Sequence, residues 1–169
     1  NIEAVVLDAD GVIFENEVFE GNIPCKVKIR SHYDGQGISL LRAIGIRIVC
    51  ITGESGESAI PIQNLVDRWN NLPSTKISGK ARWEPIKLFT GMIGENKVSA
   101  AEEWLKEVGL SWEQSAGMGD DLVDIPFLRK VSFVAVPSQA ENVVKKMAHF
   151  VTPRSGGIAG RPARPGARS

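Results

Sequence analysis

The chain has 169 residues, 43% of them apolar, and its 20 basic and 20 acidic side chains give a formal net charge of zero. This length suffices for one well-buried domain, and the balanced charge provides no overall field that would attract nucleic acid or an anionic membrane. Because no stretch approaches the roughly 20 apolar residues of a membrane span and no secretory leader is recognisable, we expect a cytoplasmic domain with a small-molecule partner.

The first predicted element is a strand over residues 2–7, a continuous Val/Leu-rich run of the kind buried on both faces of a parallel sheet. The alternating residues 14–30 predict a β-hairpin. A helix that ends at Gly45 follows, and residues 46–52 predict a second buried strand that should place Cys50 in the core. Neither cysteine has the spacing of a metal or redox motif.

The alternation of strands and helices continues to about residue 151. Residues 55–85 form the least regular stretch, which we interpret as an insertion with one helix over 60–69. The other expected elements are strands over 86–89, 116–119, 132–136 and 149–151, and helices over 98–108 and 139–147.

This order of elements predicts an α/β fold, with a Rossmann-like parallel sheet flanked by helices, a β-hairpin insertion after the first strand and no large cap domain. We expect a single domain over residues 1–153. The Gly-, Pro- and Arg-rich residues 154–169 predict a flexible tail.

Chemically useful side chains follow the predicted strands or begin the helices. Since ligands of open α/β sheets bind at the carboxyl ends of the strands, these side chains are expected to converge there. They are Asp8 and Asp10, Thr52 and Gly53, Lys97, and Asp120, Asp121 and Asp124.

This set of residue types is suited to phosphoryl transfer through an aspartyl-phosphate. Asp8 is the expected nucleophile, and Asp10 the acid that protonates the leaving oxygen and later accepts a proton from water. The Thr52 hydroxyl and the Gly53 N–H are expected to bind phosphoryl oxygens. Lys97 begins a helix, where its ammonium and the nearby N–H groups favour an anion.

The clustered carboxylates also predict a magnesium site, because hard oxygen ligands are those that Mg²⁺ selects. The expected ligands are the carboxylates of Asp8 and Asp120 and the main-chain carbonyl of Asp10. We expect Asp121 and Asp124 to lie behind these ligands, with Asp124 orienting either the lysine or the metal. Taken alone, each of these acids could also be an ordinary turn or helix-cap residue.

The four segments 8–11, 51–53, 96–97 and 119–124 resemble the ordered motifs of the haloacid dehalogenase superfamily of phosphatases. The early hairpin, with residues 34–41 and 155–157, is similar to the capless subgroup. That subgroup contains phosphatases for 3-deoxy-D-manno-octulosonate 8-phosphate and nonulosonate 9-phosphates, and the C-terminal domain of some CMP-sialic acid synthetases. The resemblance implies a sugar-acid phosphate as substrate, and a homotetramer in which neighbouring subunits complete the active sites.

Two positions depart from this subgroup. Glu54 stands where the octulosonate enzymes have an arginine after the Thr-Gly pair, and Tyr33 where an arginine usually precedes the Asp-Gly pair. A bidentate arginine contact with a carboxylate has no equivalent in glutamate or tyrosine, so an octulosonate substrate is in doubt. From the resemblance, Asp34 is expected to contact the substrate or to be structural.

Two other functions fit parts of the sequence. A non-catalytic oligomerisation domain, as in the synthetase-fused relatives, would not need the paired acids Asp8 and Asp10. A phosphoryl-accepting signalling domain has two adjacent acids on its first strand and its phosphorylated aspartate on a later one. The order of acidic motifs in this chain disfavours that arrangement.

Overall fold

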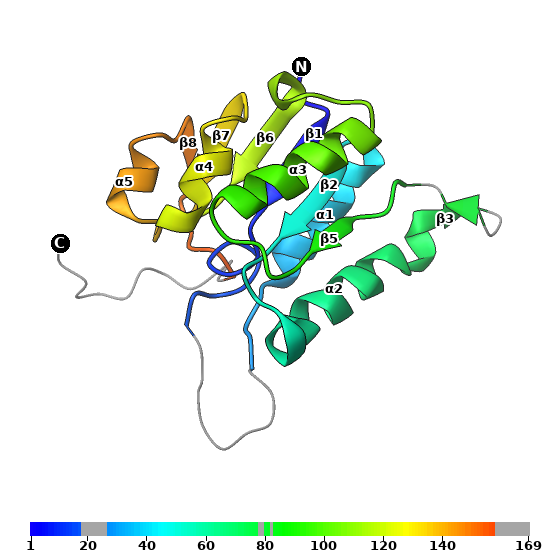
Figure 1. Ribbon diagram of the computed structural model, residues 1–169. Helices are drawn as coiled ribbons and strands as arrows, with labels where there is room; N and C mark the ends of the chain where they lie inside the picture. The colour runs from blue at the N-terminus through cyan, green and yellow to red at the C-terminus, as the bar shows by residue number, and fades with distance from the viewer. Residues whose placement is uncertain (18–26, 78–79, 82, 158–169) are drawn as a thin grey trace.

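A central sheet of six parallel strands organises the computed structural model, which describes residues 1–17, 27–77, 80–81 and 83–157 (Figure 1). The strand order is β5-β2-β1-β6-β7-β8, so that β1 lies in the middle of the sheet. The strands are β1 (Ala4–Leu7), β2 (Arg47–Ile51), β5 (Lys87–Phe89), β6 (Ser115–Met118), β7 (Phe133–Val136) and β8 (Phe150–Val151). The predicted α/β fold with a parallel sheet is confirmed.

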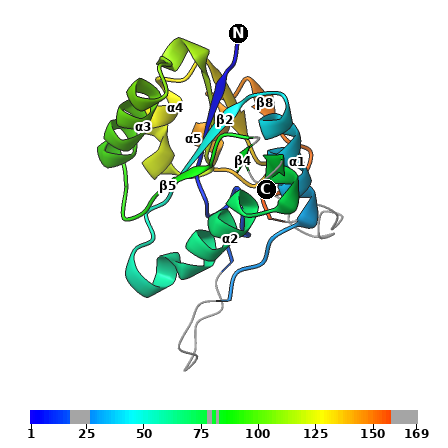
Figure 2. The same cartoon turned by 90° about the vertical axis from the view of Figure 1, so that its right-hand side faces the viewer.

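Helices cover both faces of the sheet (Figures 1 and 2). The helices α1 (His32–Ala43) and α2 (Ile60–Asn70) contribute to the core on one face, and α3 (Glu95–Glu107) and α4 (Ile125–Leu128) to the core on the other. The short helix α5 (Asn142–Lys145) joins the α3 side through Val144. Each core forms because alternate strand residues point to opposite faces.

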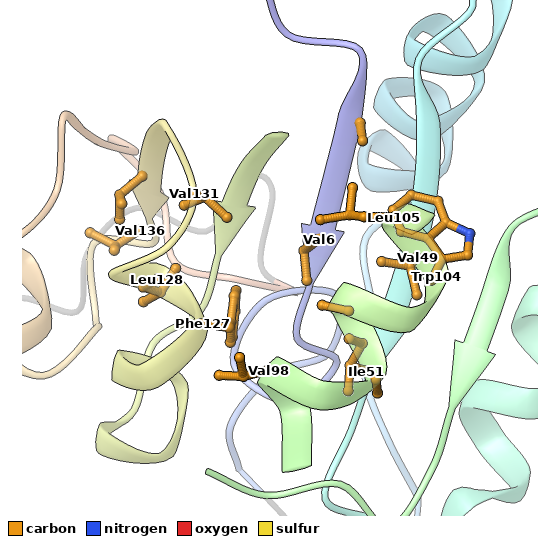
Figure 3. Close-up of a cluster of buried hydrophobic side chains, with 14 of the residues drawn as sticks. Val6, Val49, Ile51, Val98, Trp104, Leu105, Phe127, Leu128, Val131 and Val136 are labelled. Atoms are coloured by element: carbon orange, nitrogen blue, oxygen red, sulfur yellow. The ribbon is translucent and has the colours of Figure 1, made fainter. Parts of the chain in front are cut away.

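The core on the α3 side brings strand residues of β1 and β2 against two helices (Figure 3). Val6 pairs in register with Val49 on one side and with Gly117 on the other. A Cβ atom at Gly117 would lie 3.1 Å from the ring of Phe127, so the glycine lets α4 approach the sheet closely. Burying one large apolar side chain, such as that of Phe127, stabilises the folded state by about 1.5–3 kcal/mol relative to leaving it exposed. Cys50 is buried in the core on the opposite face, as predicted.

Some predicted elements differ in extent. Helix α1 begins at His32, because the Ser31 hydroxyl caps it by accepting the N–H of Tyr33 at 3.1 Å. The helix expected over 139–147 is wrong in length, since only Asn142–Lys145 are α-helical. Helix α4 was not predicted. Nor were the antiparallel strands β3 (Lys76–Ile77) and β4 (Lys80–Ala81), which lie in the stretch taken as irregular.

Two predictions fall largely outside the described residues. The β-hairpin over 14–30 includes 18–26; the residues flanking this gap approach each other, with the N–H of Glu15 donating to the carbonyl of Ile29 at 2.9 Å. Most of the predicted tail, from residue 158 onward, also lies outside them. In the part of the chain that the structure describes, no helix combines the length and the apolar character needed to cross a bilayer.

Candidate active site

The loop after β1 carries Asp8 and Asp10 at the carboxyl end of the sheet. The N–H of Asp8 still donates to the carbonyl of Met118 on β6 at 3.0 Å, so this carboxylate stands directly at the strand end. The chain then turns at Gly11, which has a φ of 76°. A Cβ atom there would lie 1.9 Å from Oδ2 of Asp120, so only glycine permits this close approach.

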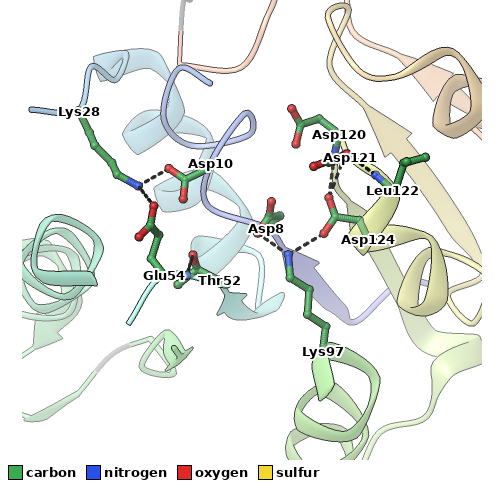
Figure 4. Close-up of polar contacts among 10 residues, drawn as sticks. All are labelled: Asp8, Asp10, Lys28, Thr52, Glu54, Lys97, Asp120, Asp121, Leu122 and Asp124. Atoms are coloured by element: carbon green, nitrogen blue, oxygen red, sulfur yellow. Dashed lines mark hydrogen bonds and ion pairs between the residues drawn. The ribbon is translucent and has the colours of Figure 1, made fainter. Parts of the chain in front are cut away.

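Seven of the nine predicted site residues line one cavity of about 300 Å³. The cavity is bounded by the ends of β1, β2 and β6 and by the beginning of α3, as expected for an open parallel sheet. The seven are Asp8, Asp10, Thr52, Gly53, Lys97, Asp120 and Asp121; Asn16, Glu54, Ile93 and Val123 also line it. Figure 4 shows the polar side chains of this region.

Lys97 lies in the first turn of α3 and is buried, with an exposed fraction of 1%. Its Nζ donates to Oδ1 of Asp8 at 2.7 Å and to Oδ1 of Asp124 at 2.6 Å (Figure 4). Burial alone would lower the pKa of Lys97, but the two carboxylates outweigh it and raise the pKa above its ordinary value. Lys97 is therefore positively charged, and its ammonium is held next to the carboxylate of Asp8.

Asp8 and Asp120 both hold their protons more tightly than an ordinary aspartate. Burial is the main reason that the pKa of Asp8 is raised to about 7; the nearby charge of Asp124 raises it further, and Lys97 partly opposes both effects. Burial and the charges of Asp124 and Asp121 raise the pKa of Asp120 to about 6. The cavity thus concentrates negative charge that the fold alone does not neutralise.

Asp124 lies behind the cavity and is fully buried. Its Oδ1 accepts from Lys97, while its Oδ2 accepts the N–H of Asp120 at 3.0 Å and the N–H of Asp121 at 3.2 Å. Asp121 caps the short 3₁₀ helix that contains Asp124. Asp124 therefore joins the lysine to the loop after β6; the orienting role expected from the sequence stays a prediction.

Three carboxylates come close enough to share one cation. Asp8, Asp120 and Asp124 each offer an oxygen, and these atoms lie within 4.8 Å of one another. The fit to a hard divalent cation is good, because the donors are all oxygens and are buried at the end of the sheet. The predicted ligand set, Asp8, Asp120 and the carbonyl of Asp10, stays a prediction.

The carboxylate of Asp10 is engaged by Lys28, a residue that the sequence analysis did not single out. The Nζ of Lys28 donates to Oδ1 of Asp10 and lies 3.5 Å from Oε1 of Glu54 (Figure 4). No local sequence signal marks this lysine, which follows the segment 18–26 and reaches the site only through the tertiary fold.

Asp34 does not line the Asp8 cavity. It lies in the first turn of α1 and borders a second cavity of about 480 Å³, with Tyr33 and Arg154 among its other lining residues. Burial raises the pKa of Asp34, and its Oδ2 has no hydrogen-bond partner within the described ranges. A direct contact of Asp34 with a phosphate at Asp8 is not part of this geometry.

The glycine pair near the end of the described chain holds the loop after β1 in place. The side chain of Gln139 donates to the carbonyl of Gly11 at 2.6 Å and accepts the N–H of Gly156 at 3.0 Å. A Cβ at Gly156 would lie 1.8 Å from that same carbonyl, and one at Gly157 would lie 2.2 Å from the nitrogen of Glu15. The motif at residues 155–157 therefore needs glycine at positions 156 and 157, because a side chain at either position would clash with the loop after β1.

The family model of haloacid dehalogenase-like hydrolases matches this chain over residues 27–159. The chain belongs to this family. It is 30% identical over 157 residues to the 3-deoxy-D-manno-octulosonate 8-phosphate phosphatase of Yersinia pestis, a match that covers 93% of this chain and 74% of the relative. The structure of a probable YrbI-family phosphatase from Pseudomonas syringae matches with a TM-score of 0.77 and 28% identity, covering 92% of this chain and 78% of that one. We therefore class the chain as a phosphatase of the haloacid dehalogenase-like family.

A more distant structure has the same fold. It is the 3-deoxy-D-manno-octulosonate 8-phosphate phosphatase from Moraxella catarrhalis, determined in complex with a magnesium ion, a phosphate ion and a KDO molecule. Its TM-score is 0.72 at 23% identity, covering 92% of this chain and 79% of that one. At this identity the likeness concerns the fold alone.

Proposed function

We propose that this phosphatase is a Mg²⁺-dependent phosphomonoesterase that hydrolyses a small sugar-acid phosphate through an aspartyl-phosphate. The observation that carries the proposal is the placement of Asp8, backed by Lys97 at 2.7 Å, in one cavity with Asp10 and Asp120. This arrangement offers a nucleophile, an acid and base, and a cation site within reach of one phosphoryl group.

In the first step, a carboxylate oxygen of Asp8 attacks phosphorus and the bond between phosphorus and the ester oxygen breaks. Lys97 donates to Oδ1 of Asp8, which leaves Oδ2 to form the new bond. Asp10 transfers its proton to the departing ester oxygen, so that an alcohol leaves instead of an alkoxide. The Thr52 hydroxyl and the Gly53 N–H, both at the cavity wall, bind the phosphoryl oxygens.

In the second step, water attacks the phosphorus of the aspartyl-phosphate. Asp10, now a carboxylate, takes a proton from that water, and the bond between phosphorus and Asp8 breaks. Inorganic phosphate is released, and both side chains return to their starting states. Using one carboxylate as nucleophile divides a difficult hydrolysis into two easier displacements.

The charge of the cavity supports a requirement for a divalent cation. The described lining residues include five acids and a single lysine, Lys97. A phosphate dianion would be repelled by such a surface. A Mg²⁺ ion held by Asp8 and Asp120, with Asp124 close behind, would offset the negative charge of the nucleophile and the phosphate together.

The substrate class, the assembly and the compartment are proposed from the resemblance and from the named relatives. We propose a sugar-acid phosphate of the octulosonate or nonulosonate type, with Glu54 and Tyr33 as the positions at which specificity differs. We further propose a cytoplasmic homotetramer in which neighbouring subunits complete the sites. Residues 1–153 would form its single domain.

The test is phosphate release from a panel of sugar-acid, sugar and nucleotide monophosphates, with Mg²⁺ and with EDTA. Wild type would be compared with Asp8→Asn and with Asp67→Asn, a matched control at an exposed position of α2. We expect metal-dependent release that Asp8→Asn lowers by roughly 10³-fold or more and that Asp67→Asn leaves unchanged. Absence of release by folded, Mg²⁺-supplied wild type would favour a non-catalytic scaffold instead.

A further inference from the structure

Lys28 places a buried ammonium beside Asp10. Unlike a lysine in a surface ion pair, it is shielded from solvent and contacts more than one group. Its side chain is only 4% exposed, whereas that of Asp10 is 27% exposed. The ammonium contacts Asp10 and Glu54 and lies 5.5 Å from the centre of the Phe14 ring. A lysine loses conformational freedom and hydration when it is held in this way, so these contacts must offset a real cost.

The main chain fixes the lysine relative to the loop that carries Asp10. Phe14 forms an antiparallel bridge with Arg30, and the N–H of Glu15 donates to the carbonyl of Ile29 at 2.9 Å. On the other side, the N–H of Phe14 donates to the carbonyl of Ala9 at 2.9 Å. The residues next to Lys28 and those next to Asp10 are therefore tied into one unit.

We propose that Lys28 is the positioning residue for Asp10, which rests on the proposed function of Asp10 as the acid and base. Its ammonium donates to Oδ1 of Asp10, which directs the carboxyl group into the cavity and leaves Oδ2 to exchange the proton with the ester oxygen. Glu54 is the second anchor, because its Oε1 lies 3.5 Å from the same ammonium. Lys28 itself neither gives nor accepts a proton in the reaction.

This role has a consequence that a purely structural role lacks. In the first step, a proton from Asp10 matters when the leaving group is an alkoxide, as in a sugar phosphate, and matters little when it is p-nitrophenolate, which departs without one. The second step hydrolyses the same aspartyl-phosphate for every substrate, so the difference is expected in kcat/KM, which reports the steps up to departure of the leaving group. Loss of the positioning lysine should therefore lower kcat/KM for an alkyl phosphate much more than for p-nitrophenyl phosphate. General loss of folding or of metal would slow both substrates by the same factor.

The experiment compares Lys28→Met and Lys28→Arg with wild type on the preferred sugar phosphate of the panel and on p-nitrophenyl phosphate, under saturating Mg²⁺. The readout is the ratio of the two kcat/KM values from one preparation, which is independent of the fraction of active protein and of the second step that both substrates share. Lys87→Met is the matched control, because that lysine also pairs with a carboxylate, Glu107 at 3.4 Å, and lies 5.7 Å from a phenylalanine ring, but outside the cavity.

For Lys28→Met we expect kcat/KM on the sugar phosphate to fall by roughly 10- to 100-fold and on p-nitrophenyl phosphate by less than about threefold, given the usual size of general acid catalysis. Lys28→Arg should recover part of the loss, and Lys87→Met should behave as wild type. Equal losses on both substrates, or wild-type values for Lys28→Met, would overturn the proposal.

A second arm separates this proposal from the proposed function itself. In an Asp10→Asn background, adding Lys28→Met should cause no further loss on the sugar phosphate, because the lysine acts only through Asp10. A full additional loss in that background would refute the positioning role. If Asp10→Asn alone leaves the sugar-phosphate rate unchanged in an active enzyme, the assignment of Asp10 as acid and base fails, and the proposal for Lys28 fails with it.

Discussion

Replacing Lys97 with methionine removes the positive charge on which the buried carboxylates of this site depend. The ammonium lies 2.7 Å from Asp8 and 2.6 Å from Asp124, and the two carboxylates are buried as well. Methionine is of similar length, so little of the effect comes from a cavity. Removing one partner of a buried ion pair typically costs about 3–5 kcal/mol, which is the expected loss in the free energy of unfolding at pH 8 with EDTA.

The cost should depend on pH in a defined direction. The pKa of Asp8 is already raised to about 7 by burial, and loss of the lysine raises it further. The native variant then binds more protons than its unfolded chain, so its stability increases as the pH falls. We expect the loss to shrink by up to about 1.4 kcal/mol for each pH unit between 8 and 6.

Urea unfolding followed by the fluorescence of the four tryptophans measures this free energy directly, provided that the slope with denaturant is unchanged. Lys87→Met is the control: it breaks an exposed pair with Glu107 and should cost about 0–1 kcal/mol at every pH. A loss under about 1 kcal/mol for Lys97→Met at pH 8, or the same loss at pH 6, would refute the charge argument.

Two other predictions concern the same cavity. Because the pKa values of Asp8 and Asp120 are raised to about 7 and about 6, the metal-free protein should gain stability from these groups as the pH falls from 8 to 5. Mg²⁺ should bind more weakly over that range and release protons when it binds; calorimetry in two buffers of different ionisation enthalpy would detect both, and a pH-independent affinity would contradict the assignment. Gly11→Ala should lower Mg²⁺ affinity and kcat by at least roughly tenfold, since the new Cβ would lie 1.9 Å from Oδ2 of Asp120. Gly45→Ala, also at positive φ but facing open space, should cost only about 1 kcal/mol of stability and no activity; equal effects of the two substitutions would show that backbone strain alone is responsible.

The centre of the parallel sheet could be predicted because β1 and β2 are short, mainly apolar runs, each followed by a polar residue. The strands β1 and β2 supply buried side chains to the cores on both faces of the sheet, and such strands are recognisable without any tertiary information. Elements that depend on contacts elsewhere were harder to predict. Helix α4 has only four residues, Ile125–Leu128, and its place next to Gly117 depends on the absence of a side chain on β6.

The same distinction applies to the candidate site. Asp8 and Thr52 directly follow strands and Asp120 comes two residues after β6 ends, so the topology of the sheet brings them together once the strands are correct. Lys28 depends on how residues 27–30 pack against the loop after β1, which no periodicity encodes. Asp34 was expected from a resemblance to contact the substrate or to be structural; it lines a cavity other than that of Asp8, and its role stays a prediction.

The two lysines of the described site are already paired with carboxylates of the protein, and the carboxylates outnumber them. Lys97 is held by Asp124, which is fixed in turn by the N–H groups of Asp120 and Asp121. Lys28 is held between Asp10 and Glu54. Both lysines are thus committed to carboxylates of the protein, and neither is left to neutralise a phosphate alone. Asp8 and Asp120 still have raised pKa values, first because they are buried and then because the charge of Asp124 lies close to both. A divalent cation would offset the negative charge of these carboxylates and of a bound phosphoryl group. The electrostatic cost of the folded site is thereby linked to the chemistry proposed for it.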